Sequence, residues 1–301
     1  MVYYSSILCS LFPRASKGAA VRKRAIMICG IEKLDHENAG VREKIFSFLA
    51  ENEKHALFIL GNLNMNFPQS HIYAAVTEGR WLGIAAYYSL KNSLIPFSMD
   101  ADVTRALTRH VADVHTHIDY VNGIAYAAAP AYDELLQMGY QPANNPHQVF
   151  MEMTGIPPLQ QQEAFIRQMQ KQDHAEIAHL VRCLNGTWDE SRPPTAEELE
   201  WVGLSPLRTA VTANGRIVAT ASSNGLGIRC YQIMGVVTHP DYRRRGYARA
   251  AVAAMMRIMT GLGGRHAVLF TEQGNIAAQE CYRGLGFNIT GEYYIAKLKK
   301  I

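Results

Sequence analysis

The sequence predicts an α/β protein with two lobes, each built from a sheet that is flanked by helices. The chain has 301 residues, more than one ordinary core needs and enough for two domains. Each half also shows the same order of patterns: helical periodicity, then alternating strands, then helix–strand pairs. Hydrophobic residues make up 48% of the chain and charged residues 19%, a balance typical of globular rather than disordered proteins.

The second half gives the clearer pattern of elements. Two alternating runs flank Asn214-Gly215, a favoured pair for a type I′ turn, and they predict a β-hairpin over 207–225. Asp173 is a typical N-cap for a helix over 174–184. The other predicted elements are strands at 164–170, 230–238, 266–271 and 292–298, a helix from about 244 to 261 and a helix from Asn275.

The first half repeats this skeleton. A long helical stretch over 39–63 precedes two strands that turn at Glu78-Gly79-Arg80, and a helix ends at a tight turn on Gly139, as a later one does on Gly286. We interpret this as an internal duplication, in which the first copy lacks about one short loop of chain. The alternative is a chance similarity between two α/β halves.

Composition shifts divide the chain. Pro157, Pro158 and three glutamines predict a linker at 155–163 between domains at 27–154 and 164–301. Residues 1–26 are basic and free of acids, and we expect them to be disordered. They resemble a mitochondrial presequence, but we favour an upstream extension or a misplaced start ahead of Met27. We therefore expect a cytoplasmic protein, or one of the mitochondrial matrix if this stretch is a presequence.

Charge and cysteine usage exclude several classes of protein. The net charge is only +4 and the basic residues are spread along the chain, so nucleic-acid binding is not favoured. Five widely spaced cysteines without a Cys-x-x-Cys pair indicate a reducing compartment and no zinc knuckle. No apolar run reaches the roughly 20 residues that span a bilayer, so no membrane partner is expected.

The stretch "HPDYRRRGYARAAVAAM" at 239–255 is the most informative motif. It places three arginines between the end of a strand and the start of a helix, where free backbone N–H groups and the helix dipole attract anions. Gly246 allows the backbone to approach a ligand closely. A solvated turn would also read this way, but the loop suits a diphosphate better than a DNA groove.

Two motifs in this half resemble the GNAT N-acyltransferase superfamily. The acetyl-CoA loop pattern Arg/Gln-x-x-Gly-x-Gly/Ala falls on Arg243, Gly246 and Ala248. A second pattern, Asn-x-x-Ala-x-x-x-Tyr-x-x-x-Gly-Phe, fits "NIAAQECYRGLGF" from Asn275 to Phe287. The resemblance covers about 164–300 and is nearest to the glycine-N-acyltransferase-like branch.

The resemblance implies a fold and a cofactor. Each lobe would have a mixed, mostly antiparallel central sheet, and in the second lobe a strand pair would splay to admit an acyl-CoA, most simply acetyl-CoA. Gly235 inside "IMGVV" offers a physical cause, because glycine in a strand suits a bulge. The residues expected to bind the cofactor are Val236, Val237, Arg243, Arg244, Arg245, Gly246, Tyr247, Ala248 and Asn275.

The same resemblance implies catalytic residues. Tyr282 matches the general acid that protonates the leaving thiolate, and a phenol with an ordinary pKa near 10 is protonated at neutral pH; a packed core tyrosine is the alternative. Glu272 and His239 are candidates for the base that deprotonates the amine. Cys281 is expected to be a structural thiol. His110, His115 and His117 lack a completing ligand, so we expect no metal site.

The first half departs from the pattern. The place of the arginine loop reads "NSLIPFSMDADVTRAL", and Tyr132 is too far from Gly139 to match Tyr282. We expect this half to bind no cofactor, to pack on the second half and to form a wall of the substrate cleft.

The predicted function is transfer of an acyl group, most simply acetyl, from coenzyme A directly to a small-molecule amine. A non-catalytic acyl-CoA sensor is the alternative. The segment 184–201, with Trp188 and Trp201, is expected to line the acceptor pocket, and the fold also allows a homodimer.

Overall fold

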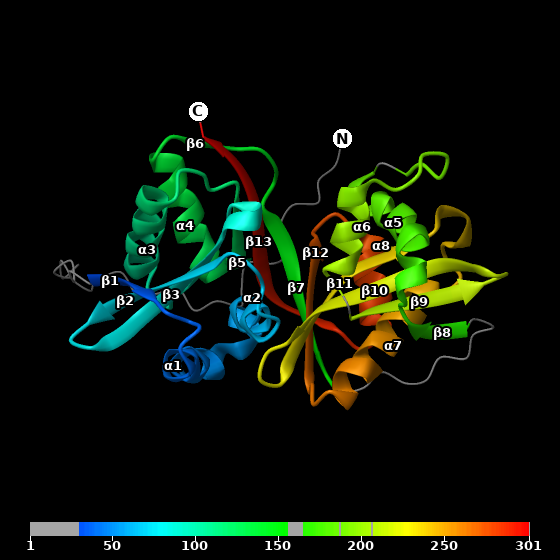
Figure 1. The fold of residues 1–301 in the computed structure, drawn as a ribbon, viewed down its shortest axis with the longest axis horizontal. Helices are drawn as coiled ribbons and strands as arrows, with labels where there is room; N and C mark the ends of the chain where they lie inside the picture. The colour runs from blue at the N-terminus through cyan, green and yellow to red at the C-terminus, as the bar shows by residue number, and fades with distance from the viewer. Residues whose placement is uncertain (1–29, 156–164, 187, 206, 301) are drawn as a thin grey trace, which may run out of the picture.

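The computed structural model describes residues 30–155, 165–186, 188–205 and 207–300, which form one mixed sheet with helices on both faces (Figure 1). The predicted extension at 1–26 and most of the predicted linker lie outside these residues. The strand order is β1-β2-β3-β4-β5-β13-β7-β12-β11-β10-β9-β8, and β6 pairs with β13. The pairs β4–β5 and β11–β12 are parallel, and the other described pairs are antiparallel. The predicted mixed, mostly antiparallel α/β fold is confirmed.

The two halves have the same order of elements. The first half contains β1 (Gly30–Leu34), α1 (Ala39–Leu49), α2 (Glu53–Asn64), β2 (Ser70–Thr77), β3 (Arg80–Tyr88), β4 (Ser93–Phe97), α3 (Ala101–Val114), β5 (Tyr120–Ile124), α4 (Ala125–Gln137), β6 (Tyr140–Pro142) and β7 (His147–Thr154). The second half contains β8 (Phe165–Gln168), α5 (His174–Arg182), α6 (Ala196–Gly203), β9 (Arg208–Ala213), β10 (Arg216–Leu226), β11 (Cys230–Thr238), α7 (Tyr247–Gly261), β12 (His266–Glu272), α8 (Ile276–Arg283) and β13 (Asn288–Lys300). This common order supports a duplication, which stays a prediction.

The predicted hairpin turns form where the sequence places them. Asn214 and Gly215 have φ angles of 52° and 76°, the positive pair that a type I′ turn needs, and Arg216 pairs with Ala213 directly across the turn. Glu78 and Gly79 repeat this geometry in the first half, with φ angles of 50° and 75°. Local turn chemistry therefore fixes both hairpins.

Two predicted helix boundaries and one predicted side-chain cap are wrong. The stretch at 39–63 is broken by a 3₁₀ turn at Ala50–Asn52 into α1 and α2. Helix α7 begins at Tyr247 rather than near Arg244, because Arg244 and Gly246 have φ angles of 60° and 82° and cannot continue a helix. The carboxylate of Asp173 accepts hydrogen bonds from Arg167 and from the Gln170 backbone, so it caps the preceding 3₁₀ turn and not α5.

The last strand of each half lies in the other half's part of the sheet. Strand β7 of the first half pairs with β12 from Gln148 to Thr154, and β13 of the second half pairs with β5. The two exchanged strands also pair with each other, so the sheet runs without interruption through the middle of the molecule (Figure 1). The halves are thus joined by backbone hydrogen bonds as well as by side-chain packing.

The helices cover the second half's strands in two layers. Helices α7 and α8 pack on one face, where the small side chains of Ala250, Ala251 and Ala253 let α7 lie close to the sheet. Helices α5 and α6 cover part of the opposite face, and α2 of the first half covers another part through Leu57. The first half thus supplies a helix to the second half's sheet. None of the helices in the described part of the chain is long and apolar enough to span a bilayer.

Candidate active site

Strands β11 and β12 run together only at their first residues. Their parallel ladder joins Cys230–Gln232 to His266–Val268, and no later pair is present among the described residues. Beyond that point β11 stays with β10 as far as Thr238, while β12 stays with β7 as far as Glu272. The sheet therefore opens between these two strands, as the family resemblance implies.

Gly235 marks a bulge at this opening. Between Thr220 and Ser222 on β10, the paired residues on β11 move from Val237 to Met234, so β11 carries extra chain there. Gly235 has a φ of 57°, and a Cβ atom on it would lie 2.8 Å from the Ser222 Oγ atom. The bulge needs glycine for both reasons, and it follows the last residue pair between β11 and β12. Val236 and Val237 follow directly on this unpaired edge.

The arginine loop follows the end of β11. Arg243, Arg244 and Arg245 are exposed, and Gly246 stands at the N-cap of α7 without a side-chain cap on the helix. The Arg243 Nε atom donates to the Thr238 carbonyl at 3.5 Å, and the Arg245 guanidinium lies over the ring of Tyr242. The first-turn N–H groups at Tyr247 and Ala248 thus combine with three cationic side chains, an arrangement that suits a diphosphate.

Tyr282 lies on α8 among the residues packed under α7. Its side chain is 8% exposed and packs edge-on against Phe287, and its hydroxyl group makes no hydrogen bond to another described residue. Burial raises the pKa of Tyr282 well above the ordinary phenol value, and the neighbouring Cys281 adds to the shift. The phenol is therefore in its acid form at neutral pH, as a proton donor requires. Burial also raises the pKa of the Cys281 thiol, which fits a structural role.

Asn275 opens α8. Its Oδ1 atom accepts a hydrogen bond from the Ala278 backbone at 3.1 Å and so caps the helix. The Gln279 side chain holds the preceding loop through the carbonyls of Glu272 and Gln273. Asn275 thus caps α8, in addition to the cofactor contact that the sequence predicted for it.

The two predicted base candidates lie in different surroundings. Glu272 is exposed at the end of β12, beside the opening. His239 is 2% exposed, its Nδ1 atom accepts from the Asp241 backbone at 3.2 Å, and its Nε2 atom lies 3.0 Å from the Glu190 Oε1 atom. Both ring nitrogens of His239 are thus occupied, which favours a positioning role over proton abstraction.

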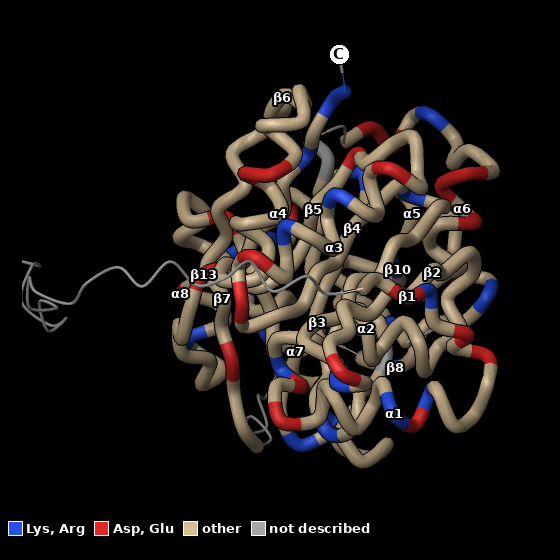
Figure 2. Tube along the Cα trace, turned by 90° about the vertical axis from the view of Figure 1, so that its left-hand side faces the viewer, with Lys and Arg blue, Asp and Glu red and all other residues tan. Residues whose placement is uncertain are grey.

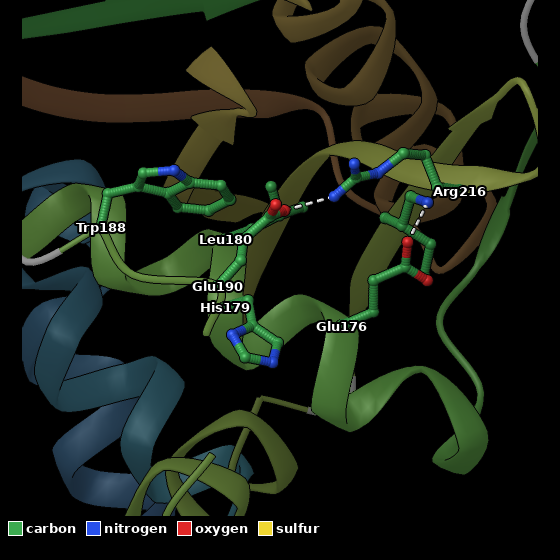
Figure 3. Close-up of a pocket in the computed structure, with 7 residues that line it drawn as sticks. Glu176, His179, Leu180, Trp188, Glu190 and Arg216 are labelled. Atoms are coloured by element: carbon green, nitrogen blue, oxygen red, sulfur yellow. Dashed lines mark hydrogen bonds and ion pairs between the residues drawn. The ribbon is translucent and has the colours of Figure 1, made fainter. Parts of the chain in front are cut away.

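The segment that follows α5 forms a pocket of about 200 Å³ (Figure 3). Trp188 forms one wall, and Arg216 pairs with Glu190 across the pocket. Glu190 also contacts His239, so this pocket adjoins the arginine loop. The other lining residues are Glu176, His179, Leu180 and Ile217. Trp201, predicted to share this role, lies instead against Lys91 of the first half, 4.8 Å from its Nζ atom to the ring centroid.

One residue beside the opening was not identified from the sequence. Arg208, the first residue of β9, is 2% exposed, and its Nε and Nη1 atoms have no hydrogen-bond partner among the described residues. In the sequence, Arg208 is only a charged residue at the start of a predicted strand that is otherwise mostly apolar. Sequence patterns alone cannot show whether such a charge has an oppositely charged partner.

The equivalent place in the first half differs. The side chain of Asp100 caps α3 through the N–H groups of Asp102 and Val103, so a carboxylate already fills the anion position of that helix. The strands do not differ in this way: the parallel ladder of β4 and β5 ends after two residue pairs, as that of β11 and β12 ends after three. The capped helix supports the prediction that the first half binds no cofactor.

The histidines of the first half pack among aromatic rings. The ring of His115 stacks on Tyr87 at 3.9 Å, and its Nε2 atom bonds the Tyr73 hydroxyl at 2.8 Å. His110 lies on α3, whereas His115 and His117 lie beyond its end. No group of three or more potential metal ligands occurs in the described residues.

Charges of both signs are mixed along the part of the chain that the structure describes. In the view of Figure 2, Lys and Arg lie interspersed with Asp and Glu. This view shows no long run of basic residues of the kind that binds a nucleic-acid backbone.

Comparison with known proteins agrees with this geometry. The model of the acetyltransferase (GNAT) family matches residues 174–287, less than half of the chain but the part that holds the opening, the arginine loop and Tyr282. The chain therefore carries a GNAT acetyltransferase domain, a domain type that transfers acetyl groups from acetyl-CoA. No curated protein matches the sequence significantly.

Several solved structures resemble most of the chain. A Drosophila protein has 12% identity and a TM-score of 0.63, with 89% of this chain and 98% of that one covered. A tandem GNAT protein from the clavulanic acid biosynthesis pathway has 13% identity and a TM-score of 0.56, covering 90% and 98%. A GNAT-family acetyltransferase from Colwellia psychrerythraea has 12% identity and a TM-score of 0.53, covering 90% and 100%. At these identities the likeness shows the fold alone.

Proposed function

We propose that this chain, whose second half carries a GNAT acetyltransferase domain, is an N-acyltransferase that moves an acetyl group from coenzyme A directly to the amine of a small molecule. The observation that carries the proposal is the opening between β11 and β12 with a cationic helix N-terminus at its end. The parallel ladder between β11 and β12 stops after three residue pairs. Beyond that point β10 still pairs with β11, and β7 still pairs with β12. A strand edge with unpaired amides can accept an extended, amide-containing ligand.

The residues present fit an acyl-CoA. The N–H groups at the start of α7, with Arg243, Arg244 and Arg245, would hold the diphosphate, and the edge of β11 at Val236 and Val237 would hold the pantetheine amides. When bound, the thioester supplies an activated acyl carbon. Tyr282 holds a proton on its hydroxyl oxygen for the leaving thiolate, because burial keeps the phenol un-ionised.

The first half contributes to the site in this proposal. Helix α2 covers β10 and β11, and β7 supports β12 along its whole length. Helix α2 thus covers part of the face opposite α7, and β7 provides the hydrogen-bonded neighbour of β12. The branch related to glycine-N-acyltransferases, the tandem origin and the oligomeric state remain predictions.

Two measurements test the proposal. Calorimetry of the full chain should show binding of acetyl-CoA, and a thiol-release assay across a panel of amines and acyl-CoAs should show turnover with at least one pair. The absence of heat at millimolar acetyl-CoA, on folded protein, contradicts the proposal. Binding without turnover on any amine would favour the acyl-CoA sensor instead.

A further inference from the structure

A small cavity lies where β11 and β12 begin to part. Gln232 and Val268, the last residue pair of their parallel ladder, line it together with Phe270, the next residue of β12 on the same face. Val268 and Phe270 pack with Leu57 of α2, so the cavity is on the face opposite α7. Its volume is about 10 Å³, which is room for one water molecule or one amine nitrogen.

The first half supplies the wall that faces these strands. Helix α2 contributes four lining residues, β7 contributes one and β13 another, namely Lys54, His55, Leu57, Phe58, Phe150 and Tyr293. Of these side chains, that of His55 is the one whose ordinary pKa lies near neutral pH. The cavity thus joins the inner end of the opening to a titratable group of the first half.

The ring of His55 is held from one side. Its Nδ1 atom lies 3.2 Å from the hydroxyl oxygen of Tyr126 on α4, and the ring packs edge-on against Tyr126 and Phe150, with centroids 5.6 Å and 5.8 Å apart. Its Nε2 atom has no hydrogen-bond partner among the described residues. We assign the ring proton to Nδ1, where Tyr126 accepts it, and this tautomer leaves the Nε2 lone pair free to take a proton.

The surroundings of His55 favour its neutral form. Burial lowers the pKa of His55, Glu152 on β7 raises it by less, and Lys54 on the same helix lowers it again. Lys54 and Glu152 form an ion pair with each other, so their opposite charges act on the ring together. Tyr126 and Tyr293 are un-ionised, because burial raises the pKa of each phenol. His55 is therefore an unprotonated base at pH 7.

Gln232 is the second polar group of the cavity. Its side chain is 2% exposed, and its Oε1 atom has no hydrogen-bond partner among the described residues. A buried amide oxygen without a donor is unfavourable, and an amine N–H group in the cavity would supply that donor. Because an amide does not titrate, Gln232 can hold a nitrogen there but cannot take its proton.

We propose that His55 is the general base of the reaction, so that the first half supplies a catalytic group to the site in the second half. This inference rests on the proposed acyl transfer. The ammonium group of the acceptor donates to the Gln232 Oε1 atom and gives a proton to the His55 Nε2 atom, directly or through one water molecule.

The protons and electron pairs balance with the role of Tyr282. The freed electron pair of the nitrogen attacks the acyl carbon, and the C–S bond breaks. The thiolate takes the proton of Tyr282, and the second proton that the nitrogen loses as the amide forms replaces it. The imidazolium of His55 releases its proton to water, so each turnover yields one amide, one thiol and one proton.

The two base candidates predicted from the sequence fit this role less well. Both ring nitrogens of His239 are occupied. Glu272 lies two residues beyond Phe270, at the exposed end of β12. Neither of them lines the cavity, whereas His55 does.

His55→Gln tests the inference, because glutamine keeps a polar side chain but takes no proton at neutral pH. Thiol release by the full chain is measured with acetyl-CoA and the best amine of the panel, for the wild type, His55→Gln, Glu272→Gln and the exposed control His117→Gln. We expect His55→Gln to lower kcat about 10²-fold or more at pH 7 and to keep the affinity for acetyl-CoA. His117→Gln should match the wild type, and a greater loss in Glu272→Gln than in His55→Gln overturns the inference.

The pH profile distinguishes a base from a packing residue. Wild-type kcat should rise as the pH is raised through the pKa of His55, below about 6.5, and should then stay level. In His55→Gln the rate should keep rising toward about pH 10, where the amine loses its proton without a base. A His55→Gln profile parallel to that of the wild type would show that His55 only supports the fold.

A binding experiment separates this inference from the proposed reaction. The Cε1 proton of His55 is followed by NMR in the full chain and assigned by its absence from His55→Gln, or by its displacement in Tyr126→Phe if that variant alone folds. Its signal should titrate below about pH 6.5 and should shift when acetyl-CoA is added. If acetyl-CoA binds and leaves this signal unmoved, the inference fails and the acyltransferase stands; if acetyl-CoA does not bind, both fail.

Discussion

One carboxylate oxygen of Glu53, in the first half, lies 2.6 Å from the backbone nitrogen of Cys230 in the second. The same Oε1 atom also accepts from Ile228 and Arg229, so it receives three consecutive N–H groups at the turn into β11. Asn64, at the other end of α2, donates to the carbonyls of Leu226 and Gly227. Helix α2 is therefore bound at both ends to the turn that joins β10 to β11, the strand that borders the proposed cofactor site.

Glu53→Ala should destabilise the protein by about 2–3 kcal/mol, because three charge-assisted backbone contacts lose their acceptor. Chemical denaturation followed by circular dichroism measures the free energy of unfolding. The control is Glu51→Ala, an exposed carboxylate two residues earlier. Equal stability of the two variants would show that α2 is held mainly by packing.

Gly235→Ala should weaken both the fold and acetyl-CoA binding. Alanine at a φ of 57° costs about 1–2 kcal/mol, and its Cβ would press on the Ser222 Oγ atom. The bulge would relax, and the opening between β11 and β12 would narrow. Calorimetry gives the affinity and thermal unfolding the stability.

Gly261→Ala serves as the matched control, since nothing lies within 4 Å of a Cβ at the last residue of α7. It should bind acetyl-CoA as the wild type does. An unchanged affinity in Gly235→Ala would mean that the opening does not depend on the bulge.

Tyr282→Phe should lower kcat about 10²–10⁴-fold, the usual contribution of a general acid, and leave the affinity for acetyl-CoA unchanged. Because burial raises the pKa of Tyr282, the wild-type rate should not fall between pH 7 and about 10 through loss of this proton. Thiol release across pH gives both results. Tyr132→Phe on α4 is the control, and a Tyr282→Phe enzyme of full activity would reduce Tyr282 to a packing residue.

The sequence predicted local features better than strand partners. The hairpin at Asn214-Gly215 and the helix start at Asn275 follow from short-range chemistry, and both were correct. The exchange of β7 and β13 could not be predicted, because the alternation along β7 is the same whichever neighbour it pairs with. The same limit explains why Arg208 was not identified from the sequence. Its importance depends on whether a strand or helix distant in the sequence supplies a partner for its charge.

The pair Arg167–Asp173 should make stability depend on acid pH. Hydrogen bonds from Arg167 lower the pKa of Asp173, and they outweigh burial, which raises it. Because the pKa of Asp173 is lower in the folded than in the unfolded protein, its ionised carboxylate stabilises the fold fully above about pH 4, the ordinary pKa of aspartate. This stabilisation is lost as the pH falls through the lower pKa of the folded state. Asp173→Asn should therefore be less stable than the wild type at pH 6, and the difference should shrink below about pH 4.

Denaturation midpoints across this pH range test the sign of the effect. Asp113→Asn, at an exposed position on α3, should show no such convergence. A constant difference between Asp173→Asn and the wild type down to pH 2 would mean that the Asp173 charge is not what stabilises the turn.

The exchanged strands predict that neither half folds alone. A chain cut between residues 157 and 158 leaves β7 with the first half, so β12 and most of β13 lose their neighbour in the second. The first half in turn loses β13, which pairs with β5 and β6. Each half expressed alone should be aggregated or unfolded, because an unpaired central strand exposes both backbone groups and apolar side chains.

Co-expression of the two halves tests whether they depend on the exchanged strands β7 and β13 or are two independent domains in contact. The halves should co-purify as a stable complex that binds acetyl-CoA, since together they contain every strand of the sheet. Glu53→Ala in the first half should weaken that complex, because α2 then loses its contact with the turn into β11. A second half that is monomeric, folded and active by itself would show that β7 and α2 are dispensable for the site.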